Sequence, residues 1–347
     1  MRVGRRGSLR HPFRDFAKVT DRSASRTLQR RMADFGAERS FQNTAVALKE
    51  HYNIEVPVYT IDKATADIAR QAKHFNSQAP GSIQPAATLI SEVDGSMLPI
   101  VGFGEEKPNT QSAAIDHPAG KRPDKRKLRK CHWKEIRVST VRVPGSLETY
   151  YGVAVGEPLA VGCMMLECCK FKGMGEATHI HAVADGASWI AEQYDRQFGI
   201  RCKFHLDFYH VCEYLAAAAR STAMDLEQRN VWLEGCKKLL RESEIDTVIT
   251  RLKTLAREIE GKEETEALAT AIAYIEKRRH QLDYREAIRQ ELPIGSGEVE
   301  SAHRHILQKR LKIPGAWWRL ERAEEMAQLR AMRANQRWDS FWQEKCA

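Results

Sequence analysis

Two Asp-Gly pairs and one pair of glutamates are the residues whose types and spacing fit metal-dependent chemistry. Asp94-Gly95 and Asp185-Gly186 each follow an apolar, strand-like run, and Glu298 and Glu300 begin a segment with a helical pattern. Carboxylates from two strand ends and one helix can hold a pair of divalent metal ions about 4 Å apart, which activate water and stabilise a leaving oxygen. Mg²⁺ prefers such hard oxygen ligands. Each Asp-Gly pair alone is more typical of a simple turn, so only the set indicates a site.

The elements that would position these carboxylates have the pattern of an α/β sheet. Apolar and alternating runs predict strands over 88–93, 133–143, 150–155, 179–184 and 202–206, and helices over 160–172, 187–198 and 208–220. This order predicts an α/β sheet. Asp94 and Asp185 are expected where strands end, the usual place for a site in such sheets.

The chain after the sheet is predicted to be almost wholly helical. Residues 222–290 carry three apolar stripes at helical spacing, and a sharp Pro- and Gly-containing turn follows at 292–297. A helix is expected to begin near Glu298 and to stop at Pro314-Gly315. A last helix is expected from Trp317-Trp318 to about Arg337. The two tryptophans could stack on nucleic-acid bases, but packing against this helix is the more common role.

The N-terminal region is predicted to contain a basic arm followed by three short helices. Residues 1–26 are expected to form the arm. The apolar stripe of the first helix begins at Leu28, the second helix follows a candidate N-cap at Ser40, and the third follows Pro57. Three short helices with a tight turn before the third are what a DNA-binding helix-turn-helix needs. A plain helical bundle packed on the next domain would show the same pattern.

Charge and composition indicate a folded protein with an anionic partner. The net charge is +9, apolar residues make up 42% and charged residues 29% of 347 residues, and no apolar run approaches the roughly 18 residues of a membrane span. No secretory signal is expected, because residues 1–32 are basic and contain no apolar run. The eight cysteines include no CxxC pair and resemble neither a zinc site nor a secreted disulfide framework, so reduced thiols in the cytoplasm are expected. Basic residues concentrate in 1–32, 121–142 and 301–347. Each basic run alone could be a solvated face of the protein. The three runs together favour nucleic acid as the anionic partner.

Four motifs stand out in the sequence: Asp94-Gly95-Ser96-Met97-Leu98-Pro99, Val183–Ile190 (VADGASWI), Leu206-Asp207-Phe208-Tyr209-His210 and Gly295–Arg304 (GSGEVESAHR). They resemble motifs of bacterial insertion-sequence transposases of the DDE class, in the ISKra-like and Mutator-like group. The first departs from the family's DGTxxP in having serine for threonine. The last two are specific, and with a Gly-Ala-Trp-Trp match at 315–318 the motifs span about two thirds of the chain.

The resemblance implies an RNase H-like fold with a helical insertion. Together with the element pattern, it predicts a catalytic domain over 87–221 and 291–347 and an all-α insertion over 222–290. The helix-turn-helix-like DNA-binding region expected from the helical stripes covers 27–80. It implies Asp94, Asp185 and Glu300 as catalytic residues and ligands of Mg²⁺ or Mn²⁺. Glu298 is the alternative to Glu300 as the third acid. Because the two glutamates are two residues apart on a helix, they cannot both face the metal ions.

Further residues are expected to support the site or to bind DNA. In related families the pair corresponding to Asp207 and His210 lies beside the acids, although a helix-capping histidine is an alternative for His210. Arg304, one turn after Glu300, could pair with that glutamate or bind the scissile phosphate. The expected phosphate contacts in the basic loop are Lys121, Arg122, Lys125, Arg126, Lys127, Arg129 and Lys130.

The function expected from these features is metal-dependent DNA strand cleavage and strand transfer at insertion-sequence ends. The expected partners are the terminal inverted repeats, target DNA and further copies of this chain on the DNA, with no membrane. Two alternatives stay open: an RNase H-like nuclease that cuts without joining, and a DNA-binding regulator with an inactive catalytic domain. The expected location is the cytoplasm, in association with the nucleoid.

Overall fold

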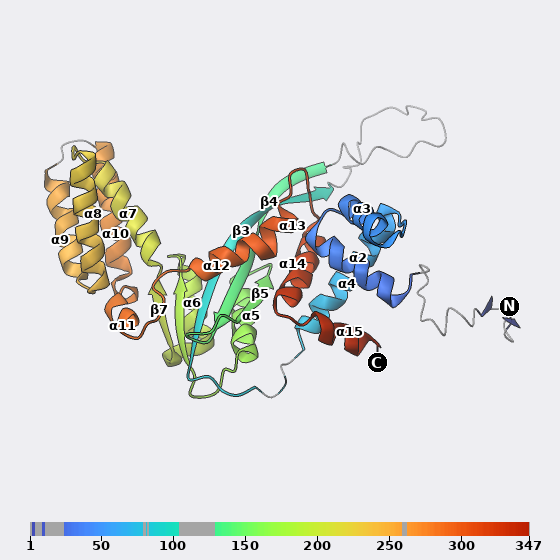
Figure 1. Cartoon of the computed structure of the whole chain (residues 1–347). Coiled ribbons are helices and arrows are strands. Elements are labelled where there is room, and N and C mark those ends of the chain that lie inside the picture. Colours follow the sequence, from blue (N-terminus) through green and yellow to red (C-terminus); the bar gives the residue numbers. More distant parts are fainter. Residues whose placement is uncertain are drawn as a thin grey trace, which may run out of the picture. The chain divides into compact units, whose positions relative to one another are not determined.

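The computed structural model describes residues 2–3, 9–10, 24–78, 81, 83–103, 129–258 and 262–346 (Figure 1). The chain divides into two compact units. The first comprises Met1–Gln78, Ser96–Ile136 and His303–Ala347, and the second comprises Ala79–Gly95 and Arg137–Ala302. The predicted α/β class is confirmed. Residues 303–347, expected to complete the catalytic domain, are grouped with the first unit.

A five-stranded mixed sheet is the centre of the α/β part. Its order is β5 (Thr149–Ala154), β4 (Arg129–Arg142), β3 (Thr88–Phe103), β6 (His179–Ala184) and β7 (Cys202–Leu206). β3 pairs with β6 and β6 with β7 in parallel, whereas β4 and β5 are antiparallel. The predicted order of strands and helices from β3 to α7 is confirmed.

Strand β3 is longer than the sequence pattern predicts. We expected it to end at Val93, but it continues through Asp94 to Phe103. Beyond Gly95 the side chains of Leu98 and Ile100 are buried, and Ile100 forms an isolated bridge with Trp318. Alternating burial thus keeps the chain extended across a segment whose Gly, Ser and Pro residues suggest a turn.

Two layers cover the sheet of the second unit. Helices α5 (Pro158–Phe171) and α6 (Ser188–Phe198) pack on one face, where Leu89, Ile180 and Ala182 meet Met165 and Tyr194. On the other face, Ile90 contacts Ala287 of α11 (Tyr284–Arg289) and Leu292 of the following turn. Helix α12 (Gly297–Ala302) comes directly after this turn.

The helical block follows β7 (Figure 1), and a cluster of buried apolar side chains forms its core. It consists of α7 (Phe208–Arg220), α8 (Leu226–Arg241), α9 (Ile245–Arg257) and α10 (Lys262–Lys277). Leu215, Leu240, Leu252, Leu268 and Ile275 are fully buried in this core. The three helices predicted between residues 222 and 290 are confirmed, and α11 is a short fourth.

The three predicted N-terminal helices are also confirmed. They are α2 (Arg26–Glu38), α3 (Phe41–Tyr52) and α4 (Val58–Asn76), and the hydroxyl of Ser40 caps α3 as expected. Asn53 ends α3 in the left-handed conformation, with φ 53°. The two short strands β1 (Arg2–Val3) and β2 (Leu9–Arg10) pair with each other.

Helix α14 (Leu320–Ala334) packs along α4, and α15 (Trp338–Cys346) follows it. Ion pairs join Lys73 to Glu324 and Arg322 to Asp62, each at 2.8 Å. We expected one helix from Trp317 to Arg337. It begins at Leu320 because the backbone of Trp318 pairs with β3 and its indole Nε1 donates to the Leu311 carbonyl, 3.1 Å away.

None of the helices in the described ranges has the length and apolar character that crossing a bilayer requires.

Candidate active site

Three aspartates follow the paired residues of three neighbouring parallel strands. Val93 of β3 pairs with Ala184 of β6, and Ala184 pairs with Leu206 of β7. Asp94, Asp185 and Asp207 are the next residue in each case. Neighbouring strands lie about 4.8 Å apart. The register therefore brings the backbones of Asp94 and Asp185, expected from the sequence to form one site, next to each other.

The turn after β6 holds the Asp185 carboxylate by a local hydrogen bond. The backbone N–H of Ala187 donates to Asp185 Oδ1 at 3.0 Å. The adjacent carbonyl of Gly186 accepts from Arg278, at 2.6 Å from Nη2 and 3.2 Å from Nε. Arg278 directly follows α10, so the helical block contributes to the surroundings of Asp185.

Tyr274 of α10 explains why glycine follows Asp185. A Cβ atom on Gly186 would lie 2.3 Å from Tyr274 Oη and 2.8 Å from Arg278 Nε. Burial, together with the charges of Asp185 and Asp207, raises the pKa of Tyr274 to about 12. The phenol therefore stays protonated beside these carboxylates at neutral pH.

Asp207 is a buried anchor for the turn that leads into α12. Its Oδ1 accepts from the backbone N–H groups of Tyr209 and His210, and its Oδ2 accepts from both the N–H and the hydroxyl of Ser296 at 2.6 Å. Burial acts to raise the pKa of Asp207, but the hydrogen bonds from His210 and Ser296 outweigh it and lower the pKa to about 2. Asp207 is thus ionised and fully occupied by protein donors.

His210 faces Asp207 across one turn of α7, with Nδ1 3.4 Å from Oδ1. The hydrogen bond to Asp207 raises the pKa of His210 to about 9, and the charges of Asp207, Glu213 and Asp185 act in the same direction. His210 therefore carries a positive charge at neutral pH, on a partly exposed side chain close to Asp185. Asp207, not His210, is the N-cap of α7, and His210 lies in the first turn of that helix. The expected role of His210 beside the acids stays a prediction.

Glu92 is a buried acid near the candidate site that the sequence pattern did not single out. It lies two residues before Asp94, is 1% exposed, and its Oε2 accepts from the N–H of Val299 in α12 at 2.9 Å. Burial raises its pKa to about 7, although the Val299 bond and Arg142 oppose this. The signal in the sequence was one acidic residue inside an otherwise strand-like run.

The two candidate third acids differ in their surroundings. Glu298 is half-buried and its Oε1 accepts from the hydroxyl of Thr149 at 3.1 Å. Burial raises the pKa of Tyr151, and the charge of Glu298 adds to this effect. Glu300 is exposed on α12. Glu298 is therefore engaged with β5, and the Glu300 side chain is open to solvent.

A complete metal-binding cluster is not assembled in the described part of the chain. No three His, Cys, Asp or Glu side chains there are close enough together to hold one ion. The structure brings Asp94 and Asp185 to adjacent strands but does not bring Glu300 to them as a third ligand. The donor chemistry of the two aspartates, carboxylate oxygen alone, still fits a hard divalent cation.

The expected DNA-binding residues are only partly described. Arg129 and Lys130 are exposed at the start of β4. Arg304 is exposed in the π-helical segment η4 (His303–Gln308). Lys121, Arg122, Lys125, Arg126 and Lys127 lie outside the described residues.

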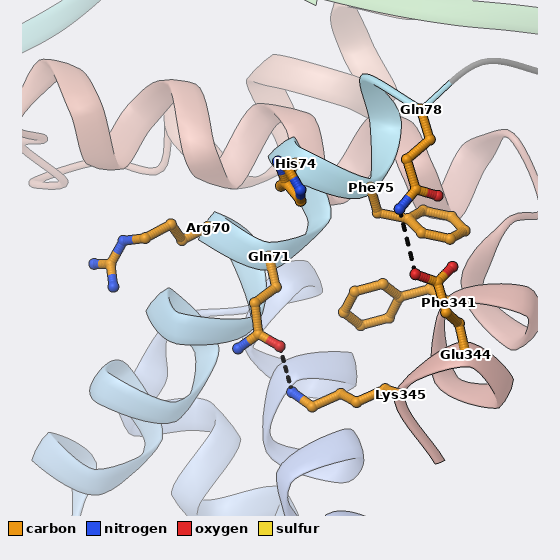
Figure 2. A pocket seen from close by; sticks show the side chains of 8 residues that line it. All are labelled: Arg70, Gln71, His74, Phe75, Gln78, Phe341, Glu344 and Lys345. Carbon is orange, nitrogen blue, oxygen red and sulfur yellow. Dashed lines mark hydrogen bonds between the residues drawn. The ribbon is translucent and has the colours of Figure 1, made fainter. Parts of the chain in front are cut away.

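A separate pocket of about 380 Å³ lies between α4 and α15 (Figure 2). Phe75 and Phe341 meet edge to face in its wall, with ring centroids 5.5 Å apart. Gln71 accepts from Lys345 at 2.7 Å, and Gln78 donates to Glu344 at 3.3 Å. Its lining includes none of the predicted site residues, and these polar groups bind one another. The pocket therefore has no part in the candidate site.

Part of the chain matches a known family model. Residues 173–345 match the family model of UPF0236, an uncharacterised protein family. The matched region includes Asp185, Asp207 and Glu300 but begins after Asp94. No curated protein matches the chain.

Proposed function

We propose that this protein is a DNA transposase of the DDE class, which cuts DNA strands at insertion-sequence ends and transfers them to target DNA. The observation that carries the proposal is the parallel pairing of Val93 with Ala184, after which Asp94 and Asp185 follow on adjacent strands. The motif resemblance implies the same two residues as metal ligands. The sheet order β5-β4-β3-β6-β7 supports an RNase H-like domain interrupted by the helical block.

Asp94 and Asp185 would hold Mg²⁺ or Mn²⁺, with Glu300 as the third ligand. Such ions activate a hydroxyl for attack on a phosphodiester and stabilise the leaving oxygen. The exposed position of Glu300 leaves its side chain available to join the two aspartates. Asp207 orients the turn before α12 through Ser296, and Glu92 holds the N–H of Val299 within that helix.

DNA would be bound by the cationic side chains outside this cluster. His210 supplies a positive charge close to Asp185, and Arg304, Arg129 and Lys130 are exposed. The helices α2, α3 and α4 would recognise the terminal inverted repeats, and several copies of the chain would assemble on the DNA. The protein would act in the cytoplasm, in association with the nucleoid, because its substrate lies there.

A strand-joining assay tests the proposal. The full chain is incubated with Mg²⁺, a duplex ending in the inverted repeat that flanks its gene, already cut to expose the 3′-OH, and a supercoiled plasmid. We expect plasmid molecules covalently joined to the repeat end. Nicked plasmid without joined product would favour a nuclease. Binding of the repeat with neither reaction would favour a regulator, and both results would contradict the proposal.

A further inference from the structure

The peptide bond between Gly186 and Ala187 is hydrogen-bonded at both ends. Its N–H donates to Asp185 Oδ1 at 3.0 Å. Its carbonyl oxygen accepts from the guanidinium of Arg278, at 2.6 Å from Nη2 and 3.2 Å from Nε. A single rigid peptide plane therefore connects Arg278 to the Asp185 carboxylate, although the two residues are far apart in the sequence.

Arg278 is itself held in place by the helical block. Its guanidinium carbon lies 4.0 Å from the ring centre of Tyr274, and its Nη1 donates to the Tyr274 carbonyl at 3.4 Å. The ring of Tyr274 stacks on Tyr214 of α7, with centroids 3.8 Å apart and planes 17° from parallel. These contacts restrict the rotamers of a side chain that otherwise has high conformational entropy.

The bonds from Arg278 act on the Ala187 N–H in two ways. Charge-assisted hydrogen bonds are about twice as strong as neutral ones, so they favour one orientation of the peptide plane. A cation at the carbonyl also polarises the amide and strengthens its N–H as a donor. Both effects favour the same position of the Asp185 carboxylate.

We propose that Arg278 is a positioning residue for Asp185, which it orients through the Gly186–Ala187 peptide. The inference rests on the proposed function in taking Asp185 as a metal ligand. It gives the helical block a direct role at the site, because Arg278 directly follows α10. Two side chains of the block, Tyr274 and Tyr214, stabilise the position of Arg278. The contacts around metal ligands commonly change metal affinity by about 10- to 100-fold when they are removed.

Hydrogen exchange at the Ala187 amide tests the connection without a metal ion. Arg278→Met removes the donors and keeps an apolar stem, and Arg278→Lys keeps the charge and leaves fewer donors. Arg279→Met is the matched control, because Arg279 forms an exposed ion pair with Asp246. We expect Ala187 to exchange about ten times faster in Arg278→Met, at an intermediate rate in Arg278→Lys, and unchanged in the control. Wild-type rates in both Arg278 variants would overturn the proposal.

Mn²⁺ affinity tests whether the Gly186–Ala187 peptide affects metal binding by Asp185. It is measured on the same variants and on Asp185→Asn. We expect about tenfold weaker binding for Arg278→Met, partial recovery in Arg278→Lys, and no change in Arg279→Met. If Asp185→Asn weakens binding and the Arg278 variants do not, the role of Arg278 is wrong and the metal site stands. If Asp185→Asn itself binds Mn²⁺ as the wild type does, the metal site of the proposed function is wrong.

Discussion

The carboxylate of Asp207 accepts hydrogen bonds from both the backbone N–H and the hydroxyl of Ser296, each at 2.6 Å. These residues belong to two separate motifs, one at the end of β7 and one before α12. Gly295, next to Ser296, lies close to Tyr209: a Cβ there would be 2.6 Å from the tyrosine ring, which would have to shift. The two motifs thus form one interlocked structure that sets where α12 begins.

Asp207→Ala should destabilise the protein by about 3 kcal/mol, because several buried donors lose their acceptor together. Urea unfolding of the purified variant measures the change. Asp225→Ala is the matched control: Asp225 also caps a helix, but it is exposed, and its side chain accepts from the backbone N–H of Gln228. We expect a loss of about 1 kcal/mol there. Equal losses in the two variants would contradict the anchoring role of Asp207.

His210→Gln should make stability less dependent on pH above neutrality. The pKa of His210 is raised to about 9 in the folded protein from an ordinary value of 6.5. The stabilisation is therefore present below pH 6.5 and is lost as the pH rises through about 9. The wild-type melting temperature should fall more steeply between pH 7.5 and 9.5 than that of His210→Gln. The exposed His280 gives a control, His280→Gln, that should keep the wild-type slope.

Gly186→Ala should destabilise the protein by about 1–3 kcal/mol, because its Cβ would displace Tyr274 and Arg278. Gly297→Ala is the control, since a Cβ there meets no atom within 4 Å. That substitution, at the start of α12, should be neutral or slightly stabilising. Thermal unfolding of both variants measures the difference. An unchanged stability of Gly186→Ala would show that Tyr274 and Arg278 do not pack closely against the residue next to Asp185.

The order of elements was predictable from the sequence because it depends on local periodicity. The predicted strands and helices from β3 to α7 are all present. The end of β3 was predicted wrongly because the burial of Leu98 and Ile100 overrides a segment with turn-forming residues. Contacts of the site that join distant segments, such as Arg278 with Gly186 and Glu92 with Val299, have no periodic signal. Only the folded chain reveals them.

Glu300→Gln should abolish DNA strand cleavage, whereas Glu298→Gln should leave most of it. Glutamine at position 300 cannot supply a charged oxygen ligand, but glutamine at 298 can still accept from the Thr149 hydroxyl. Cleavage of repeat-end DNA with Mg²⁺ measures both. An inactive Glu298→Gln together with an active Glu300→Gln would reverse the assignment of the third acid.

The central claim is that Asp94 and Asp185 hold the same metal ion, and Mn²⁺ binding to single variants tests it most directly. Each protein is titrated with Mn²⁺, and the free ion is measured by electron paramagnetic resonance. The proteins are the wild type, Asp94→Asn, Asp185→Asn and the control Asp195→Asn, whose aspartate is exposed on α6. Circular dichroism verifies that each variant is folded. We predict that Asp94→Asn and Asp185→Asn each weaken binding at least about tenfold and that the control binds as the wild type does. Wild-type affinity in either Asp94→Asn or Asp185→Asn would contradict the account.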